Sequence, residues 1–182
     1  FAQTLQALIG RTAIDPAEVD DLIAGCVIQV GEQAANIGRQ AWLAAGLPES
    51  VPAVTIDRKC GSTQQAMDFA AQGVIACAYD VVIAGGVEMM SRIAMGSNRM
   101  GQDNFGPLHR AQYPDGLVHQ GISAELIAAH WHIDRQSLDT FALRSHQLAA
   151  DAAARGLTAH DIVAIGGADR DEGIRPDSTL EK

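Results

Sequence analysis

A short polar turn connects two predicted elements in the stretch Thr55-Ile56-Asp57-Arg58-Lys59-Cys60-Gly61-Ser62-Thr63-Gln64-Gln65-Ala66. The apolar, β-branched residues at 51–56 are typical of a strand. The alanine-rich residues at 62–78 are typical of a helix. Cys60 therefore lies at a strand-to-helix turn, where the free N–H groups of the first helical turn converge.

The setting of Cys60 favours a reactive thiolate. The partial positive charge of a helix N-terminus stabilises an anion, and Arg58 and Lys59 add cationic character. The small Gly61 and Ser62 leave room for a substrate to approach. These features predict that Cys60 is a covalent nucleophile. The alternative is a small buried side chain without chemistry, which is the usual role of a free cysteine.

Strands and helices alternate on both sides of this turn, and alternation of this kind predicts a layered α/β domain. The apolar run at 22–30 is typical of a parallel strand that is covered on both faces. The other predicted elements are helices at 1–9 and 36–45, a helix start at Asp15-Pro16, and a strand at 81–84.

Several residues near these elements could be either functional or structural. The pair Gly85-Gly86 predicts a backbone that turns tightly or approaches a neighbour closely, and the Cys60 site is the candidate neighbour. Glu88 could be a catalytic carboxylate, but nothing local marks it as a base, so we interpret it as a hydrogen-bonded structural group. Cys26 and Cys77 have apolar neighbours and are interpreted as packing residues.

Composition excludes several classes of protein. A net charge of −9 and a pI of about 4.9 argue against nucleic-acid binding through bulk positive charge. Three cysteines without a CxxC pair indicate a reducing compartment, and we expect a cytoplasmic protein. No stretch approaches the roughly 20 apolar residues of a membrane span. The histidines lack metal-ligand spacing, so no metal is expected.

The alternating pattern of strands and helices stops after Ser91. Residues 92–116 lack periodicity and predict a long loop of the kind that is functional or interfacial. Helical patterns then resume at 123–131, with Ser123 as the expected cap, and from Asp134 to about residue 154. A short strand is predicted at 162–165.

Two motifs are specific when taken together: Cys-Gly-Ser at 60–62 and Tyr-Asp-Val-Val-Ile-Ala-Gly-Gly-Val-Glu-x-Met-Ser at 79–91. A further segment, Gly-Ile-Ser-Ala-Glu at 121–125, accompanies them. In this combination the chain resembles the thiolase family, the acetyl-CoA acetyltransferases and 3-ketoacyl-CoA thiolases. The resemblance implies a layered α/β/α N-terminal half at residues 1–91, into which a mostly helical loop domain at 92–182 is inserted.

The resemblance also implies an activity. Such an enzyme cleaves 3-ketoacyl-CoA to acetyl-CoA and a shortened acyl-CoA, or condenses two acyl groups in reverse, through an acyl-Cys60 intermediate. The backbone N–H of Cys60 would be one oxyanion donor. His119 and Gln120 are expected on the wall that contacts the acyl-CoA. Coenzyme A thioesters are substrates, no bound cofactor is expected, and a homodimer or homotetramer is implied through the strand at 51–56.

Departures from the family pattern leave two functions open. Thr63, Met89 and Gln120 replace the commoner Gly, Ser and Met, and they suggest a degradative thiolase of fatty-acid β-oxidation that acts on larger acyl-CoAs. The family's histidine, second cysteine and asparagine motifs do not occur here, and the chain starts at Phe1 without Met, so an incomplete chain is expected. The alternative is a truncated, non-catalytic chain that binds coenzyme A or pairs with another subunit.

Overall fold

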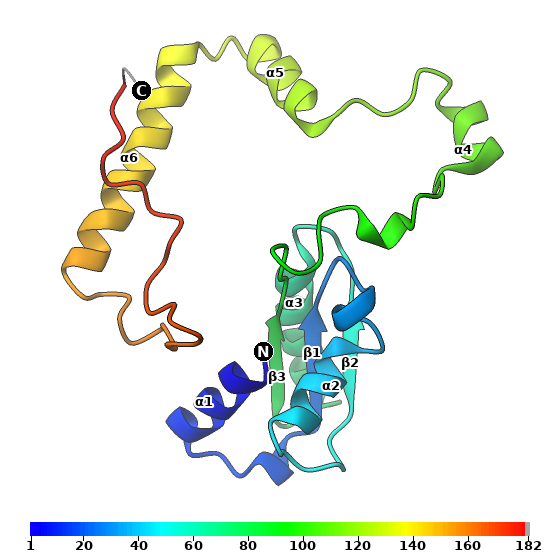
Figure 1. Ribbon diagram of the computed structural model, residues 1–182, viewed down its shortest axis with the longest axis vertical. Helices are drawn as coiled ribbons and strands as arrows, with labels where there is room; N and C mark the ends of the chain where they lie inside the picture. Colours follow the sequence, from blue (N-terminus) through cyan, green and yellow to red (C-terminus); the bar gives the residue numbers. More distant parts are fainter. Residues whose placement is uncertain (181–182) are drawn as a thin grey trace. The chain divides into compact units, whose positions relative to one another are not determined.

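The computed structural model describes residues 1–180 and divides the chain into two compact units, Phe1–Asn104 and Phe105–Lys182 (Figure 1). The first unit contains a parallel sheet with helices, and the second is mostly helical. The mixed α/β fold is the predicted one. The predicted start of an inserted domain at residue 92 stays a prediction.

Three parallel strands form the sheet of the first unit in the order β2-β1-β3. These strands are β1 (Asp21–Gly25), β2 (Ala53–Ile56) and β3 (Val82–Gly86). In the register of the sheet, Ile23 lies between Val54 and Ala84. Parallel strands need crossover connections, and helices supply them here. The carboxyl ends of all three strands therefore meet at one edge of the sheet.

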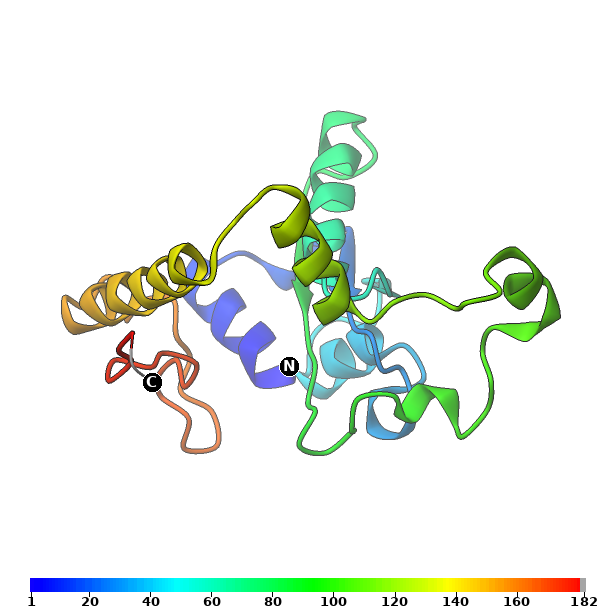
Figure 2. The same ribbon diagram turned by 90° about the horizontal axis from the view of Figure 1, so that it is seen from above.

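Helices cover both faces of the sheet, as Figures 1 and 2 show for α2 (Ile37–Ala44) and α3 (Ser62–Ile75). Neighbouring residues of a strand point to opposite faces. Leu22 joins the buried cluster that contains Trp42 of α2, and α1 (Ala2–Thr12) contributes to the same cluster. Ile23 joins the cluster on the α3 side. The α/β/α layering thus follows from β1, whose residues are buried in succession while their side chains point alternately to the two faces.

Polar side chains fix the ends of these helices. Asp15 caps the 3₁₀ helix η1 (Pro16–Glu18), as predicted. Asn36 caps α2 by accepting a hydrogen bond from the Arg39 N–H, and it also accepts one from the Thr55 hydroxyl at 2.7 Å. The cap of α2 is therefore tied directly to strand β2.

Two predicted boundaries in the first unit are wrong. The strand predicted at 22–30 ends at Gly25, because the Val27 N–H donates to the Glu88 side chain instead of a neighbouring strand. The helix predicted at 62–78 ends at Ile75. Cys77 follows in the left-handed region at φ 57° and is exposed, so its interpretation as a packing residue is also wrong.

The second unit consists of α4 (Gly106–Gln112), α5 (Gln120–His130), α6 (Arg135–Ala154) and irregular chain. None of its described residues is buried. Asp134 caps α6 as predicted.

Three sequence predictions fail in and before the second unit. The stretch at 92–116 contains α4 and the 3₁₀ helix η3 (Ser97–Arg99), so it is not loop throughout. His119 caps α5, so Ser123 is not the cap. Residues 162–165 form no strand, because a tight turn through two glycines at positive φ leaves only a bridge between Ile165 and Ala168.

Candidate active site

Cys60 is exposed in the turn between β2 and α3, at the edge where the carboxyl ends of the strands meet. The prediction that it lies at a strand-to-helix turn is confirmed. In open α/β sheets this edge is where ligands bind. The alternative interpretation of Cys60 as a buried packing residue is wrong, because its side chain is exposed.

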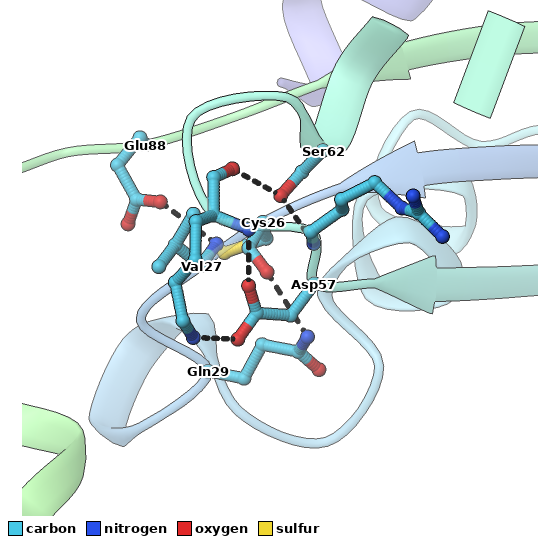
Figure 3. A network of polar contacts seen from close by, with 8 residues as sticks. Cys26, Val27, Gln29, Asp57, Ser62 and Glu88 are labelled. Atoms are coloured by element: carbon cyan, nitrogen blue, oxygen red, sulfur yellow. Dashed lines mark hydrogen bonds and ion pairs between the residues drawn. The ribbon is translucent and has the colours of Figure 1, made fainter. Parts of the chain in front are cut away.

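The turn itself is held by two side chains (Figure 3). One carboxylate oxygen of Asp57, Oδ1, accepts a hydrogen bond from the Lys59 N–H at 2.7 Å. The Ser62 hydroxyl accepts from the Arg58 N–H at 2.9 Å and donates to the Lys59 carbonyl at 2.6 Å. Ser62 is buried, so it does not provide open space for a substrate as its small size suggested. It satisfies the backbone of the turn instead.

The charge of Lys59 is paired. Its ammonium lies 2.6 Å from Oδ2 of Asp57, and the two side chains are 73% and 29% exposed. Burial opposes the ionisation of Asp57, but hydrogen bonds from the ammonium and amide of Lys59, together with its charge, lower the pKa of this carboxyl. The cationic character expected beside Cys60 is therefore partly neutralised by Asp57.

Two glycines allow α3 to dock closely on the sheet. A Cβ at Gly86 would lie 2.0 Å from Oγ1 of Thr63, and a Cβ at Gly25 would lie 2.6 Å from the Thr63 backbone nitrogen. Thr63 follows Cys60 by three residues. The predicted close approach is confirmed at Gly86, and its partner is the start of the helix that follows Cys60.

Glu88 is a structural residue, as interpreted from the sequence. Its carboxylate accepts hydrogen bonds from the Val27 N–H at 2.8 Å and from the Gln33 amide at 2.7 Å. The Gln33 oxygen accepts in turn from the Met89 N–H at 2.8 Å. This network fixes the chain that leaves β1 against the chain that leaves β3.

Cys26 lies beside this network and is 1% exposed, which confirms its predicted packing role. Burial raises the pKa of its thiol, and the charge of Glu88 raises it further. The Cys26 carbonyl also accepts a hydrogen bond from the Gln29 amide at 3.0 Å (Figure 3). Cys26 is therefore protected from reagents that reach Cys60.

The first unit has a hollow that is separate from Cys60. It has a volume of about 300 Å³ and lies among α1, α2 and the chain that follows β3. Apolar side chains such as Phe1, Ile37 and Met89 form most of its lining. None of its lining residues belongs to the turn at 57–63.

His119 and Gln120 lie at the start of α5 in the second unit. Nδ1 of His119 accepts a hydrogen bond from the Gly121 N–H at 3.2 Å, so this histidine has a local role as a helix cap. The expected contact of both residues with an acyl-CoA stays a prediction.

Sequence reasoning missed the roles of Asp57 and Gln33. An aspartate two residues before a turn residue is a pattern of the Asx turn, and this could have identified Asp57. Gln33 bonds Glu88 across a separation of 55 residues, which no local pattern reveals.

Among residues 1–180, no group of three His, Cys, Asp or Glu side chains could hold a metal ion. In the same described part of the chain, no helix is both long and apolar enough to cross a membrane.

Comparison with known proteins assigns the chain to a family. The model of the thiolase N-terminal domain matches residues 1–182. A steroid 3-ketoacyl-CoA thiolase of Mycobacterium tuberculosis is 44% identical over 97% of this chain and 46% of its own length. A 3-ketoacyl-CoA thiolase of Saccharophagus degradans is 40% identical over 99% of this chain and 48% of its own length. The chain thus spans about half the length of the curated relatives it matches.

Proposed function

This chain belongs to the thiolase family, and we propose that its Cys60 is the acyl-accepting nucleophile of a 3-ketoacyl-CoA thiolase. The observation that carries the proposal is the exposed Cys60 thiol at the carboxyl edge of a parallel sheet. The other two cysteines do not fit the role. Cys26 is buried, and Cys77 lies at the other end of α3.

The chemistry proceeds in two steps. The Cys60 thiolate adds to the C3 carbonyl of a 3-ketoacyl-CoA, and the C2–C3 bond breaks. The electron pair of that bond stays on C2, which takes up a proton and leaves as acetyl-CoA. A second coenzyme A thiol then attacks the thioester on Cys60, releases the shortened acyl-CoA and restores the thiol. Condensation of two acyl groups is the reverse of this route.

A thiolate suits this shuttle because it is both a good nucleophile and a good leaving group. The backbone N–H of Cys60 is the proposed donor to the oxyanion. Proton transfer at C2 needs an acid–base group within hydrogen-bond reach. We assign that group to the part of the protein that corresponds to the remaining length of the relatives.

The proposed substrates are coenzyme A thioesters, with His119 and Gln120 on the wall that contacts the acyl-CoA. The departures from the family pattern at Thr63, Met89 and Gln120 suggest a degradative enzyme for larger acyl groups, and we propose this substrate class. The similarity to a relative named as a steroid thiolase agrees with this size class.

A homodimer or homotetramer is part of the proposal. Within the described sheet, β2 pairs with β1 along one edge only, and an unpaired strand edge is a template for pairing with another chain. Isologous pairing across a two-fold axis would cover it.

The test of this function uses the protein expressed from its complete reading frame. Cys60→Ser is expected to lose nearly all thiolysis of acetoacetyl-CoA and of a longer 3-ketoacyl-CoA, because a hydroxyl is a weak nucleophile without a strongly activating base. Cys77→Ser, the matched control at the other exposed cysteine, is expected to retain wild-type turnover. Near-normal turnover by Cys60→Ser would remove Cys60 from the mechanism.

A further inference from the structure

We propose that Asp57 and Ser62 are positioning residues that set the orientation of Cys60 by holding the turn between β2 and α3. The inference rests on the proposed role of Cys60 as nucleophile. We name the pair the Asp57–Ser62 clamp.

The clamp holds a conformation that the chain would otherwise avoid. Lys59, the residue before Cys60, has a φ of 50°, in the left-handed region that residues with a side chain rarely adopt. Such conformations persist only where surrounding groups determine them. Here the Lys59 N–H donates to Asp57 at 2.7 Å, and the Lys59 carbonyl accepts from Ser62 at 2.6 Å. Side chains therefore bind both peptide groups of Lys59, and the Lys59 carbonyl also accepts a hydrogen bond from the Ser62 N–H at 3.0 Å.

The two arms of the clamp differ in exposure. Ser62 is 4% exposed, and its hydroxyl bridges the Arg58 N–H and the Lys59 carbonyl. Asp57 approaches from the end of β2, and its side chain is 29% exposed. The turn is further closed by the Gly61 N–H, which donates to the Arg58 carbonyl at 3.1 Å.

The helix behind the turn is anchored independently of the clamp. Thr63 packs against Gly25 and Gly86 of the sheet at distances that leave no space for a Cβ. Loss of the clamp would therefore change the peptide planes around Lys59 and the direction of the Cys60 side chain, while α3 stays docked. Attack on a carbonyl carbon requires a near-attack geometry, and a displacement of about 1 Å can cost about a hundredfold in rate.

The carboxylate of Asp57 makes two contacts that can be separated. Oδ1 accepts the backbone hydrogen bond that holds the turn, whereas Oδ2 pairs with the exposed Lys59 ammonium. Exposed ion pairs contribute little. Asparagine keeps an oxygen for the backbone N–H and loses the charge, and alanine loses both. Asp57→Asn and Asp57→Ala therefore distinguish positioning from charge.

The experiment measures the rate at which acetoacetyl-CoA acylates Cys60 in the protein from the complete reading frame, by rapid quenching and mass spectrometry. Asp57→Ala is expected to lower this rate, and kcat with it, by roughly ten- to a hundredfold, with KM within about twofold of wild type. The acylation rate of Asp57→Asn is expected to stay within about threefold of the wild-type rate. Asp68→Ala, an exposed aspartate on α3, is the matched control and is expected to match wild type.

Iodoacetamide provides the folding control. Cys26 is 1% exposed and stays unlabelled in a folded variant. Cys60 in Asp57→Ala is expected to be alkylated at a rate within about threefold of wild type, because a small reagent does not need an oriented thiol. If Cys26 becomes labelled in Asp57→Ala, the Ser62→Ala variant is used in its place. Its acylation and alkylation rates at Cys60 are then compared with those of wild type in the same way.

The proposal is overturned if the acylation rate of Cys60 in Asp57→Ala is within threefold of the wild-type rate. It is equally overturned if Cys60 is acylated as slowly in Asp57→Asn as in Asp57→Ala. It is also overturned if both Asp57→Ala and Ser62→Ala expose Cys26, because the pair is then required for folding. A wild-type protein that forms no acyl-Cys60 would instead contradict the proposed function, so the two failures are distinguishable.

Discussion

Because β3 contacts the start of α3 closely at Gly86, this is the glycine of the sheet at which we expect an alanine substitution to cost the most stability. A methyl group at this position would lie 2.0 Å from Oγ1 of Thr63 and 2.8 Å from the backbone carbonyl oxygen of Gly25. Real Cβ atoms essentially never approach a neighbour so closely, so the helix, the strand or both must shift. Overpacking of this kind typically costs about 1–3 kcal/mol. Gly86→Ala is therefore expected to lower the free energy of unfolding by at least about 1 kcal/mol, or Tm by roughly 2–10 °C.

The assay is equilibrium unfolding in urea, followed by circular dichroism, together with a thermal scan of each variant. Thr63→Ala in the Gly86→Ala background removes the closer of the two clashes and leaves the carbonyl of Gly25, so partial recovery is expected. Gly10→Ala is the matched control. Gly10 lies in α1 with no neighbour within 4 Å of an added Cβ, and an alanine there is expected to stabilise by about 0.5–1 kcal/mol.

Wild-type stability in Gly86→Ala would refute the close docking of α3 on the sheet. If Gly86→Ala lowers the free energy of unfolding and Thr63→Ala in the same background restores none of it, the side chain of Thr63 is not the neighbour that causes the loss.

Three further predictions concern other contacts. Glu88→Ala leaves the Val27 N–H without its acceptor and is expected to cost about 1–3 kcal/mol in urea unfolding, and a cost near zero would contradict the structural role of this carboxylate. Trp42→Ala is expected to cost about 3–5 kcal/mol in the same assay, because Trp42 is fully buried in the cluster on the α2 side, and a cost under 1 kcal/mol would argue against that core. The N–H and hydroxyl of Ser137 lower the pKa of Asp134, so its contribution to stability is present above its ordinary pKa of 3.8 and is lost as the pH falls through the lower folded value. Asp134→Ala is expected to show a weaker decline in unfolding midpoint between pH 5 and about pH 2, and an unchanged decline would contradict this.

Local patterns were sufficient for the strand–turn–helix around Cys60. The β-branched run before the turn and the alanine-rich run after it identified β2 and α3, and the turn between them placed Cys60. The parallel sheet followed from the length and continuity of the apolar runs, because such runs are covered on both faces. The caps Asp15 and Asp134 were also readable, since each accepts from a backbone N–H only two or three residues away.

Long-range contacts decided the points that sequence reasoning missed. Glu88 satisfies the Val27 N–H across 61 residues, and this contact ends β1 early within an apolar run that shows no break. Tyr79 packs so closely on Gly73 that a Cβ there would lie 2.3 Å from its ring. The chain reverses at Cys77 to make this contact, which leaves that thiol exposed.

The roles of Ser62 and Asp57 were hidden for a different reason. From the sequence, only the small size of Ser62 was considered and nothing was drawn from Asp57, whereas the oxygens of both side chains bind the backbone of the turn. The Asx-turn pattern points to Asp57, but recognition of the role of Ser62 requires the positive φ of Lys59, which is a property of the folded turn.

The role of Cys60 as nucleophile is tested most directly by locating the acyl group during turnover. The protein from the complete reading frame is mixed with acetoacetyl-CoA in the absence of free coenzyme A, quenched in acid, digested and mapped by mass spectrometry. We expect one acetyl group, carried as a thioester on the peptide that contains Cys60, and its removal on addition of coenzyme A. Acetyl transfer to a different residue, or turnover without any acetylated Cys60, would contradict this role.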